Sequence, residues 1–237
     1  MTLERSDAVH HPATGSPVLK PDRSGFERLL DRHAPLAPAP LCPEVRVFQA
    51  RDLMEVWEAV DRLAGEPTPS PFWAYAWPAG AALARVVLDR PALVQGLQVL
   101  DIGAGGGVAA LAAAKAGAAR VVANDEDPRA LETVALAAGR QGLHVELLQG
   151  DLTDRPDLLA GHDVVLCADL GYEGYRARRL HACLRDAHAA GAAVFVADAE
   201  RKYFDPTGLE PLARFQVDVP EDLEGVQMRE ATVYRLP

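Results

Sequence analysis

Apolar residues in the middle of the chain form short runs that alternate with segments of helical spacing. Runs rich in Val, Leu and Ile are typical of strands buried on both faces, and apolar residues that recur every three or four positions indicate helices. The predicted strands are residues 97–102, 119–125, 143–148, 162–169 and 192–198, and the predicted helices include residues 79–89, 108–117 and 175–190. This alternation predicts an α/β fold with a doubly wound, mostly parallel sheet covered by helices on both faces.

Capping residues define two further helices. Asp127 followed by Pro128 predicts a helix start, because Asp favours the N-cap and Pro favours the first helical position. Upstream, the apolar residues from Leu53 to Val60 share one helical face, and Gly65 ends that helix.

The two ends of the chain depart from this alternation. Residues 1–44 are rich in Pro and His, so we expect a loosely ordered N-terminal arm with a single docking helix around Phe26 and Leu30. Residues 45–50 alternate like a short strand. Residues 214–219 and 229–237 have the pattern of two strands with no helix between them, which predicts that the last strand is an antiparallel hairpin partner at the sheet edge.

Composition and charge limit the classes of function. The chain has 237 residues and a net charge of -10, which disfavours a sequence-independent nucleic-acid binder because such binding needs a positive surface. The apolar stretches are shorter than the roughly 20 residues of a membrane span, and the N-terminus lacks the pattern of a secretory signal. The three cysteines form no C-x-x-C pair and the histidines are scattered, so we expect reduced thiols, no metal site and a cytoplasmic protein.

The most recognisable motif is VLDIGAGGG at residues 99–107. Glycines directly after a buried strand let the backbone turn tightly and approach a ligand closely, and free N–H groups at the start of the next helix can receive a carboxylate. A dinucleotide-binding loop, G-x-G-x-x-G/A, fits poorly: counted from Gly103 it meets Val108 at its last position, and counted from Gly105 the strand ends two residues too early. The candidate cofactor-binding residues here are Asp101, Gly103, Ala104, Gly105 and Gly107.

Three further carboxylates follow predicted strands. Asp125 ends the second strand, where it can accept hydrogen bonds from ribose hydroxyls in either class of cofactor. Asp151 follows the third strand in a Gly-Asp turn, and Asp169 ends the fourth. Each has a structural alternative, as a helix cap for Asp125 and Asp169 and as a turn residue for Asp151.

The strand count and the motifs together resemble a known family. Five α/β units followed by a β-hairpin are the pattern of the seven-stranded class I methyltransferases, and Asp169-Leu-Gly-Tyr172 matches the Asp/Glu-x-x-Tyr/Phe motif of the protein lysine methyltransferases among them. With PFWAYAWP at 71–78, and GLEPLARFQVDVP and ATVYRLP near the end, the chain is similar to the bacterial relatives of the electron-transfer flavoprotein β-subunit lysine methyltransferases from about residue 45 onward. Gly171 departs from the pattern, since an aromatic residue is common there.

This resemblance implies that the methyl donor is S-adenosylmethionine, that the product is S-adenosylhomocysteine, and that no metal takes part. Asp101 would face the amino-acid moiety of the cofactor, and Asp151 would accept a hydrogen bond from the adenine amino group. Leu152 would pack near the adenine ring, and Trp77 would form a wall of the site. The implied cofactor-binding set is completed by Asp125, Ala168 and the glycine loop.

The resemblance also implies a lysine side chain as the methyl acceptor and the electron-transfer flavoprotein β subunit as the protein partner, without nucleic acid or membrane. Asp169 would orient the lysine ammonium, and Tyr172 would complete a partly aromatic pocket. Whether Asp169 or water takes the proton stays open. Phe72, Trp73 and Glu173 would lie near the acceptor entrance.

The implied organisation is an arm at 1–44 followed by one methyltransferase domain at 45–237. Within the domain we expect a strand, helix and aromatic lid (45–90), a cofactor-binding core (97–198) and a C-terminal hairpin (199–237).

Three other functions stay open on the sequence. A small-molecule N-methyltransferase acting on a nicotinamide-like base would share the cofactor half and differ in the acceptor pocket. A non-catalytic nucleotide-binding protein and an NAD-dependent oxidoreductase could share the fold. The combination of Asp101, Asp151 and the Asp169-x-x-Tyr172 motif argues against the last two.

Overall fold

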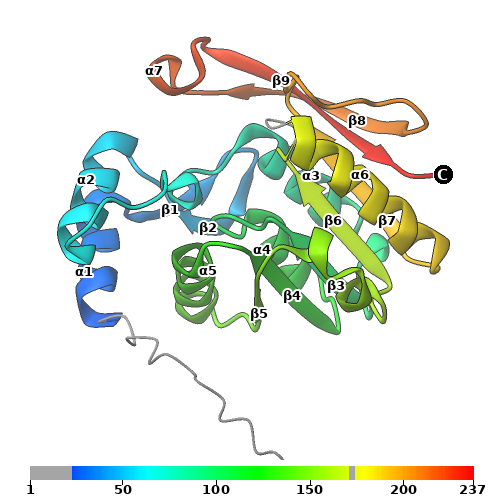
Figure 1. Cartoon of the computed structure of the whole chain (residues 1–237), viewed down its shortest axis with the longest axis horizontal. Coiled ribbons are helices and arrows are strands. Elements are labelled where there is room, and N and C mark those ends of the chain that lie inside the picture. The colour runs from blue at the N-terminus through cyan, green and yellow to red at the C-terminus, as the bar shows by residue number, and fades with distance from the viewer. Residues whose placement is uncertain (1–22, 171–173) are drawn as a thin grey trace, which may run out of the picture.

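The computed structural model describes residues 23–170 and 174–237, and its centre is one seven-stranded sheet (Figure 1). The strand order is β5-β4-β3-β6-β7-β9-β8. The first five strands are parallel and the last two are antiparallel, as the doubly wound prediction requires. The strands are β3 (Gln98–Ile102), β4 (Arg120–Asp125), β5 (Glu146–Gln149), β6 (Val164–Ala168), β7 (Ala193–Asp198), β8 (Glu210–Asp218) and β9 (Met228–Arg235).

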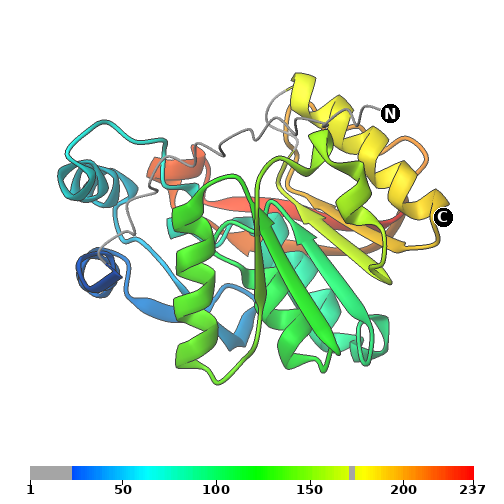
Figure 2. The same cartoon turned by 60° about the horizontal axis from the view of Figure 1, so that its bottom comes forward.

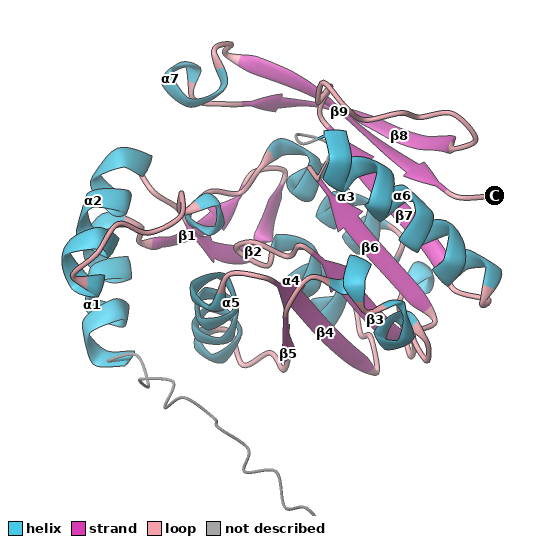
Figure 3. Cartoon of the chain, in the orientation of Figure 1, coloured by secondary structure: helices cyan, strands magenta, loops and turns pink. Residues whose placement is uncertain are grey.

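Helices cover both faces of the sheet, as Figures 2 and 3 show. One face carries α3 (Pro78–Asp89), α4 (Val108–Lys115) and α5 (Pro128–Arg140), and the other carries α6 (Gly174–Ala189) with the short 3-10 helices at 152–154 and 156–159. Alternate strand residues serve the two cores: Val99 of β3 belongs to the first and Leu100 to the second, and both are fully buried. Burial on both faces explains why these strands are continuous apolar runs in the sequence.

The predicted helix end at Gly65 and the predicted helix start at Asp127 and Pro128 are confirmed. Asp52 accepts hydrogen bonds from the backbone N–H groups of Met54 and Glu55 at the start of α2 (Leu53–Ala64), and Gly65 ends that helix in the left-handed conformation. Asp127 caps α5, which begins with Pro128. The local sequence therefore determines these boundaries through orphan N–H groups at the helix start and a left-handed turn at the helix end.

The docking helix predicted around Phe26 and Leu30 is confirmed, whereas the rest of residues 23–44, expected to be loosely held, also packs onto the domain. Helix α1 (Arg23–His33) lies beside α2, and β1 (Leu36–Ala39) pairs with β2 (Cys42–Phe48) in a separate antiparallel sheet. The Phe26 ring, 2% exposed, meets the Trp73 ring edge to face at a centroid distance of 5.4 Å. The apolar stripe of α1 thus buries itself against an aromatic partner distant in sequence, whereas the Pro-rich composition of residues 34–44 did not reveal their pairing as strands.

The C-terminal strands pair as a hairpin, but the last strand is not at the edge. Strand β9 lies between β7 and β8, and the edge strand is β8. A single helical turn, α7 (Glu221–Glu224), interrupts the connection that we expected to be free of helix. Residues 231–233 of β9 are all buried, whereas burial along β8 is sparse, as suits an internal strand beside an edge strand. Among the described residues, no helix is long and apolar enough to cross a membrane.

If α1 is part of the core, Phe26→Ala should lower the free energy of unfolding by about 3–5 kcal/mol, the usual loss for a buried Phe. Urea unfolding followed by circular dichroism measures this change. Met54→Ala on α2 is the control, because Met54 is 59% exposed and its truncation should change stability by no more than ~0.5 kcal/mol. Equal effects from the two variants would show that α1 is not part of the core.

Candidate active site

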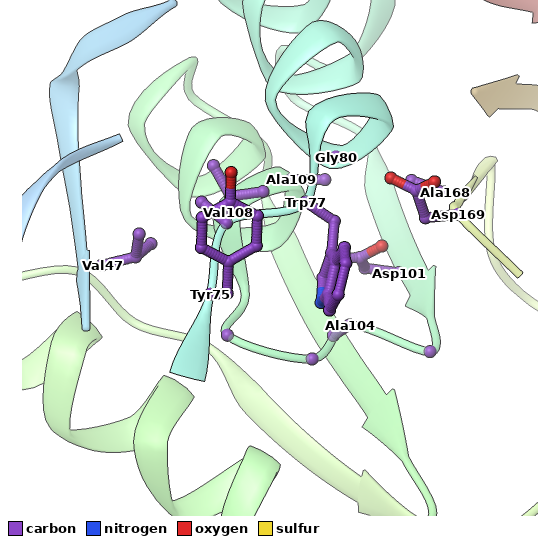
Figure 4. Close-up of a pocket in the computed structure, with 14 residues that line it drawn as sticks. Val47, Tyr75, Trp77, Gly80, Asp101, Ala104, Val108, Ala109, Ala168 and Asp169 are labelled. Carbon is purple, nitrogen blue, oxygen red and sulfur yellow. The ribbon is translucent and has the colours of Figure 1, made fainter. Parts of the chain in front are cut away.

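A pocket opens where the carboxyl ends of β3 and β6 lie side by side (Figure 4). The chain leaves β3 toward β4 and leaves β6 toward β7, in opposite directions along the sheet, so the two following loops leave a crevice between them. The lining residues are Val47, Tyr75, Ala76, Trp77, Gly80, Asp101, Gly103, Ala104, Gly105, Gly106, Val108, Ala109, Ala168 and Asp169. The structure thus brings together Asp101, most of the glycine loop, Trp77, Ala168 and Asp169, as predicted.

The glycine loop is held between the aromatic segment and α5. A Cβ on Gly106 would lie 2.7 Å from the carbonyl oxygen of Trp73, and a Cβ on Gly107 would lie 2.6 Å from a methyl carbon of Val134. Gly107, at φ +81°, also has the left-handed conformation that begins α4. Glycine at these two positions lets the loop pack closely while α4 starts directly beneath the pocket.

Asp101 is the most deeply buried carboxylate of the pocket, with 2% of the residue exposed. One carboxylate oxygen accepts a hydrogen bond of 2.9 Å from the N–H of Ala110 in α4. Burial raises the pKa of Asp101 to about 7; the Ala110 bond opposes this rise and the nearby Asp125 adds to it. Near neutral pH this carboxyl is therefore partly protonated, and a cation in the pocket would favour its ionised form.

Asp125 braces the glycine loop from the next strand. Its two carboxylate oxygens accept hydrogen bonds from the N–H groups of Gly105 (2.8 Å) and Asp127 (3.0 Å). Burial raises the pKa of Asp125, and these two bonds oppose the rise. The preceding Asn124, which sequence reasoning passed over, donates from its amide to the carbonyls of Leu148 and Gly150 and so ties β4 to the loop after β5.

Asp151 and Leu152 lie further along the same edge of the sheet and do not line the pocket. Asp151 accepts hydrogen bonds from the N–H and hydroxyl of Thr153, and Arg179 lies 3.8 Å away. Burial acts to raise the pKa of Asp151, but the Thr153 bonds and the Arg179 charge outweigh it and lower that pKa. Leu152 is 3% exposed and belongs to the core beneath α6.

The aromatic segment divides into a core residue and pocket residues. Trp73 is 2% exposed and packs on Phe26, a placement that does not suit the acceptor entrance predicted for it. Phe72 is 50% exposed, and its carbonyl accepts a 2.7 Å hydrogen bond from the indole N–H of Trp77. Trp77 lines the pocket, and the ring of Tyr75 meets it edge to face at 5.1 Å.

Tyr75 was missed from the sequence, although the adjacent aromatics could have pointed to it. Its side chain lines the pocket, and Figure 4 draws it with Trp77, Asp101 and Asp169. Burial raises the pKa of Tyr75 to about 12, and the nearby Glu224 adds to this rise. Tyr75 therefore stays a neutral phenol at physiological pH.

Asp169 directly follows β6 and has a left-handed conformation, φ +54°, which is uncommon for a residue other than glycine. One of its carboxylate oxygens accepts a 2.8 Å hydrogen bond from the N–H of Ala79. Trp77, the N-cap residue of α3, makes no side-chain capping bond. Asp169 therefore caps a free N–H at the start of α3, although it lies far from that helix in the sequence. The sequence also allowed Asp169 to cap the helix that follows it; in the part of the chain that the structure describes, the backbone N–H bound by its carboxylate is that of Ala79 in α3.

The other oxygen of Asp169 accepts a 2.7 Å hydrogen bond from Nε of Arg201, a residue that sequence reasoning missed. Burial raises the pKa of Asp169, while the Arg201 charge and hydrogen bond act against the rise. No local motif announces Arg201, because its partners are far away in the sequence. The predicted acceptor-site residues Tyr172 and Glu173 lie outside the described residues.

Metal and disulfide chemistry find no support in the described ranges. In residues 23–170 and 174–237, no group of three His, Cys, Asp or Glu side chains could hold a metal ion. Cys42, Cys167 and Cys183 are buried and free. Burial raises the pKa of each of these thiols, which keeps them protonated.

The fold and the site define a methyltransferase: a model of the methyltransferase domain matches residues 99–191, the segment that contains the glycine loop and Asp169. A putative RNA methyltransferase from Pyrococcus horikoshii has the same fold, with a TM-score of 0.54 at 18% identity over 71% of this chain and 88% of that one. The match to a methyltransferase domain sets aside the oxidoreductase and the non-catalytic alternatives.

Sequence relatives narrow the class. The electron transfer flavoprotein beta subunit lysine methyltransferase of Xenopus laevis is 30% identical over 237 residues, covering 94% of this chain and 93% of the relative. The Danio rerio protein of the same name is 34% identical over 71% of this chain and 67% of the relative, and the human one is 38% identical over 54% and 48%. The chain belongs to the family of electron transfer flavoprotein β subunit lysine methyltransferases. These relatives are from vertebrates, whereas the sequence motifs had suggested bacterial ones.

Gly106→Ala should weaken S-adenosylmethionine binding by more than about tenfold, because the new Cβ must push the Trp73 carbonyl and the loop apart. Isothermal titration calorimetry measures this affinity. Gly139→Ala is the matched control: it lies in α5 with no atom within 4 Å of the new Cβ, and it should leave affinity unchanged while stabilising the helix by up to ~1 kcal/mol. A wild-type affinity in Gly106→Ala would show that the loop accommodates the added Cβ without displacement.

Proposed function

We propose that this enzyme transfers methyl groups from S-adenosylmethionine to the side-chain amine of lysine in a protein, and that its substrate is the electron-transfer flavoprotein β subunit. One observation carries the proposal: Asp169, the carboxylate of the lysine-methyltransferase motif, lines the same pocket as Asp101 and Trp77. A donor held by the glycine loop and an acceptor amine near Asp169 would then meet within one crevice. The names of the full-length relatives support the choice of substrate.

The pocket residues fit the proposed donor. S-adenosylmethionine supplies a methyl group on a sulfonium and carries a cationic amino group. Asp101 has a single hydrogen bond from the described residues and a raised pKa, so its carboxylate can accept further donors and would gain from a nearby ammonium. Trp77 presents an aromatic face to the same space. Asp125 would receive the ribose, and Asp151 and Leu152 would bound the adenine further along the sheet edge.

The acceptor side has to orient an amine and allow it to lose a proton. A free lysine side chain has a pKa of about 10.4 and is almost fully protonated at neutral pH. Asp169 would attract the ammonium and align it, and much of the rate gain can come from this positioning. From the described residues its two oxygens each accept one hydrogen bond, and a second lone pair on each could serve the substrate. Phe72 and the predicted Tyr172 and Glu173 would border the entrance.

We place this activity in the cytoplasm, without nucleic acid or membrane as partner. Three buried, free thiols are compatible with a reducing compartment. The net charge of -10 disfavours nucleic acid and gives a basic protein segment an electrostatic advantage in approaching the enzyme.

If the cationic amino group of the cofactor binds beside Asp101, binding should release a proton at a pH of about 6. The free carboxyl has a pKa of about 7, and a nearby cation lowers it, so only the ionised form binds well. Affinity should therefore rise about tenfold per pH unit up to about pH 7 and then level off. Calorimetry at pH 5.5 to 7 in buffers of different ionisation enthalpy measures both quantities.

Asp101→Asn is the control for this linkage, because it removes the titrating group and keeps its size. The variant should bind weakly at every pH and release no proton. A wild-type affinity that does not change between about pH 5.5 and 7 would place the amino group elsewhere.

Purified enzyme should transfer radiolabelled methyl from S-adenosylmethionine to lysine of recombinant electron-transfer flavoprotein, with the site located by mass spectrometry. Asp169→Asn should lower this transfer by about 100-fold or more while changing cofactor affinity less than threefold, because the acceptor amine loses the charge that orients it. Asp52→Asn is the matched control, because Asn caps a helix as well as Asp does and Asp52 does not line the pocket.

Two results would count against these assignments. Turnover of a small amine without any methylation of the flavoprotein would favour the small-molecule alternative. Loss of cofactor binding by Asp169→Asn equal to its loss of transfer would assign Asp169 to the donor side.

A further inference from the structure

Four side chains of alternating charge link the pocket to the C-terminal hairpin. Asp169 pairs with Arg201 at 2.7 Å, Arg201 pairs with Glu224 of α7 at 2.9 Å, and Glu224 pairs with Arg229 of β9 at 3.1 Å. The side chains are largely buried: Asp169 is 8% exposed, Arg201 16% and Glu224 2%. Two positive and two negative charges balance, so the row carries no net charge into the interior.

All three nitrogens of the Arg201 guanidinium donate hydrogen bonds in this row. Nε donates to Asp169, while Nη1 and Nη2 donate to the two carboxylate oxygens of Glu224 at 3.0 and 2.9 Å. Only a planar, forked donor can satisfy two carboxylates on different edges at once. A buried carboxylate without such partners would be strongly disfavoured, so Arg201 is what allows Asp169 to sit charged beside the pocket.

The backbone also holds Arg201 in place. Its N–H donates a 2.9 Å hydrogen bond to the carboxylate of Asp198 at the end of β7, and the intervening Glu200 has a left-handed conformation at φ +58°. The second oxygen of Asp198 is buried and has no hydrogen-bond partner among the described residues. This turn has two unfavourable features, a buried carboxylate oxygen without a partner and a non-glycine residue at positive φ. Backbone strain of this kind persists at functional positions, which supports a role for the turn in fixing the backbone position of Arg201.

Arg201 also reaches the wall of the donor site. Its guanidinium carbon lies 5.4 Å from the centroid of the Trp77 ring, within the range of a cation–π contact. The indole N–H of Trp77 is held by the carbonyl of Phe72. One guanidinium therefore touches both the Asp169 carboxylate on the acceptor side and the Trp77 ring on the donor side.

We propose that Arg201 is a positioning residue for methyl transfer, which sets Asp169 and Trp77 relative to each other, and that Glu224 of the C-terminal hairpin holds Arg201 in that position. The role rests on the proposed lysine methylation but extends it to a part of the fold outside the cofactor core. The hairpin is then a working part of the active site, because α7 supplies the carboxylate that orients the guanidinium.

The test uses three variants of the full chain and two kinds of readout. Arg201→Gln removes the charge, Arg201→Lys keeps the charge without the fork, and Glu224→Gln weakens the grip of the hairpin. Arg214→Gln on β8 is the matched control, because Arg214 is 66% exposed and its ion pair with Glu230 is long at 3.7 Å. Titration with S-adenosylhomocysteine counts the folded, binding-competent sites so that kcat refers to those alone.

The first readout is the rate of methyl transfer to the flavoprotein. Arg201→Gln should lower kcat about 100-fold with less than a threefold change in the KM for either substrate. The kcat of Arg201→Lys should exceed that of Arg201→Gln by less than tenfold. Glu224→Gln should lower kcat about tenfold relative to wild type. A kcat within threefold of wild type for Arg201→Gln would overturn the proposal, as would full rescue by Arg201→Lys. If Arg201→Gln does not fold, Glu224→Gln decides by the same criteria, with a kcat within threefold of wild type overturning the proposal.

The second readout does not need a methyl acceptor. The chain has three indole N–H groups, on Trp57, Trp73 and Trp77, and a nitrogen–proton correlation spectrum resolves them once each is assigned by Trp→Phe substitution. Removing the guanidinium should shift the Trp77 signal and leave the other two in place, and Arg214→Gln should shift none. An unmoved Trp77 signal in both Arg201→Gln and Glu224→Gln would refute the positioning role. If wild-type enzyme methylates no lysine, the proposed function fails, while this spectrum still judges Arg201.

Discussion

The hydrogen-bonded pairing of β3 with β6 is the constraint on which the rest of the site depends. From these two parallel neighbours the chain proceeds in opposite directions, to β4 and β5 on one side and to β7 on the other. The loop after β3 and the loop after β6 therefore open toward each other without crossing. Asp101 and Asp169, 68 positions apart in a simple count along the sequence, consequently line one pocket. Both helical layers and both cores serve to hold that pair of strands together.

A site that gathers carboxylates in a buried crevice has to stabilise them one by one. Asp101 takes a backbone N–H from α4, Asp125 takes two from the glycine loop and α5, and Asp169 takes one from α3 and the guanidinium of Arg201. Burial nevertheless prevails and raises the pKa of all three carboxyls, to about 7 for Asp101, which has the fewest partners. In the free enzyme the ionised form of these buried carboxyls is therefore disfavoured, and a cationic ligand would stabilise it. This is a physical reason for the pocket to prefer a sulfonium and an ammonium.

Much of the cofactor half was predictable because its signals are local. The strand at 97–102, the glycine turn that follows it, and the Asp127-Pro128 helix start all lie within a few residues of the features they determine. The placement of Trp73 was not predictable in this way, since its burial depends on contact with Phe26, which lies 47 positions earlier in the sequence. The same holds for the order of β8 and β9, which depends on how well each covers β7. Arg201 stayed hidden for the same reason, because none of its partners is a sequence neighbour except through the turn at Asp198.

By itself the sequence determined the alternation of strands and helices, the caps, the glycine loop and the motif residue Asp169, because each rests on periodicity, backbone conformation or hydrogen bonds within a few residues. It also carried enough likeness to a family to imply the donor. Only the tertiary structure decided that α1 packs on Trp73, that Trp73 faces inward while Trp77 faces the pocket, and that Asp169 is shared between α3 and Arg201. These outcomes follow from burial and from charge pairing between segments distant in sequence, and such interactions have no energy until the chain has brought the partners together.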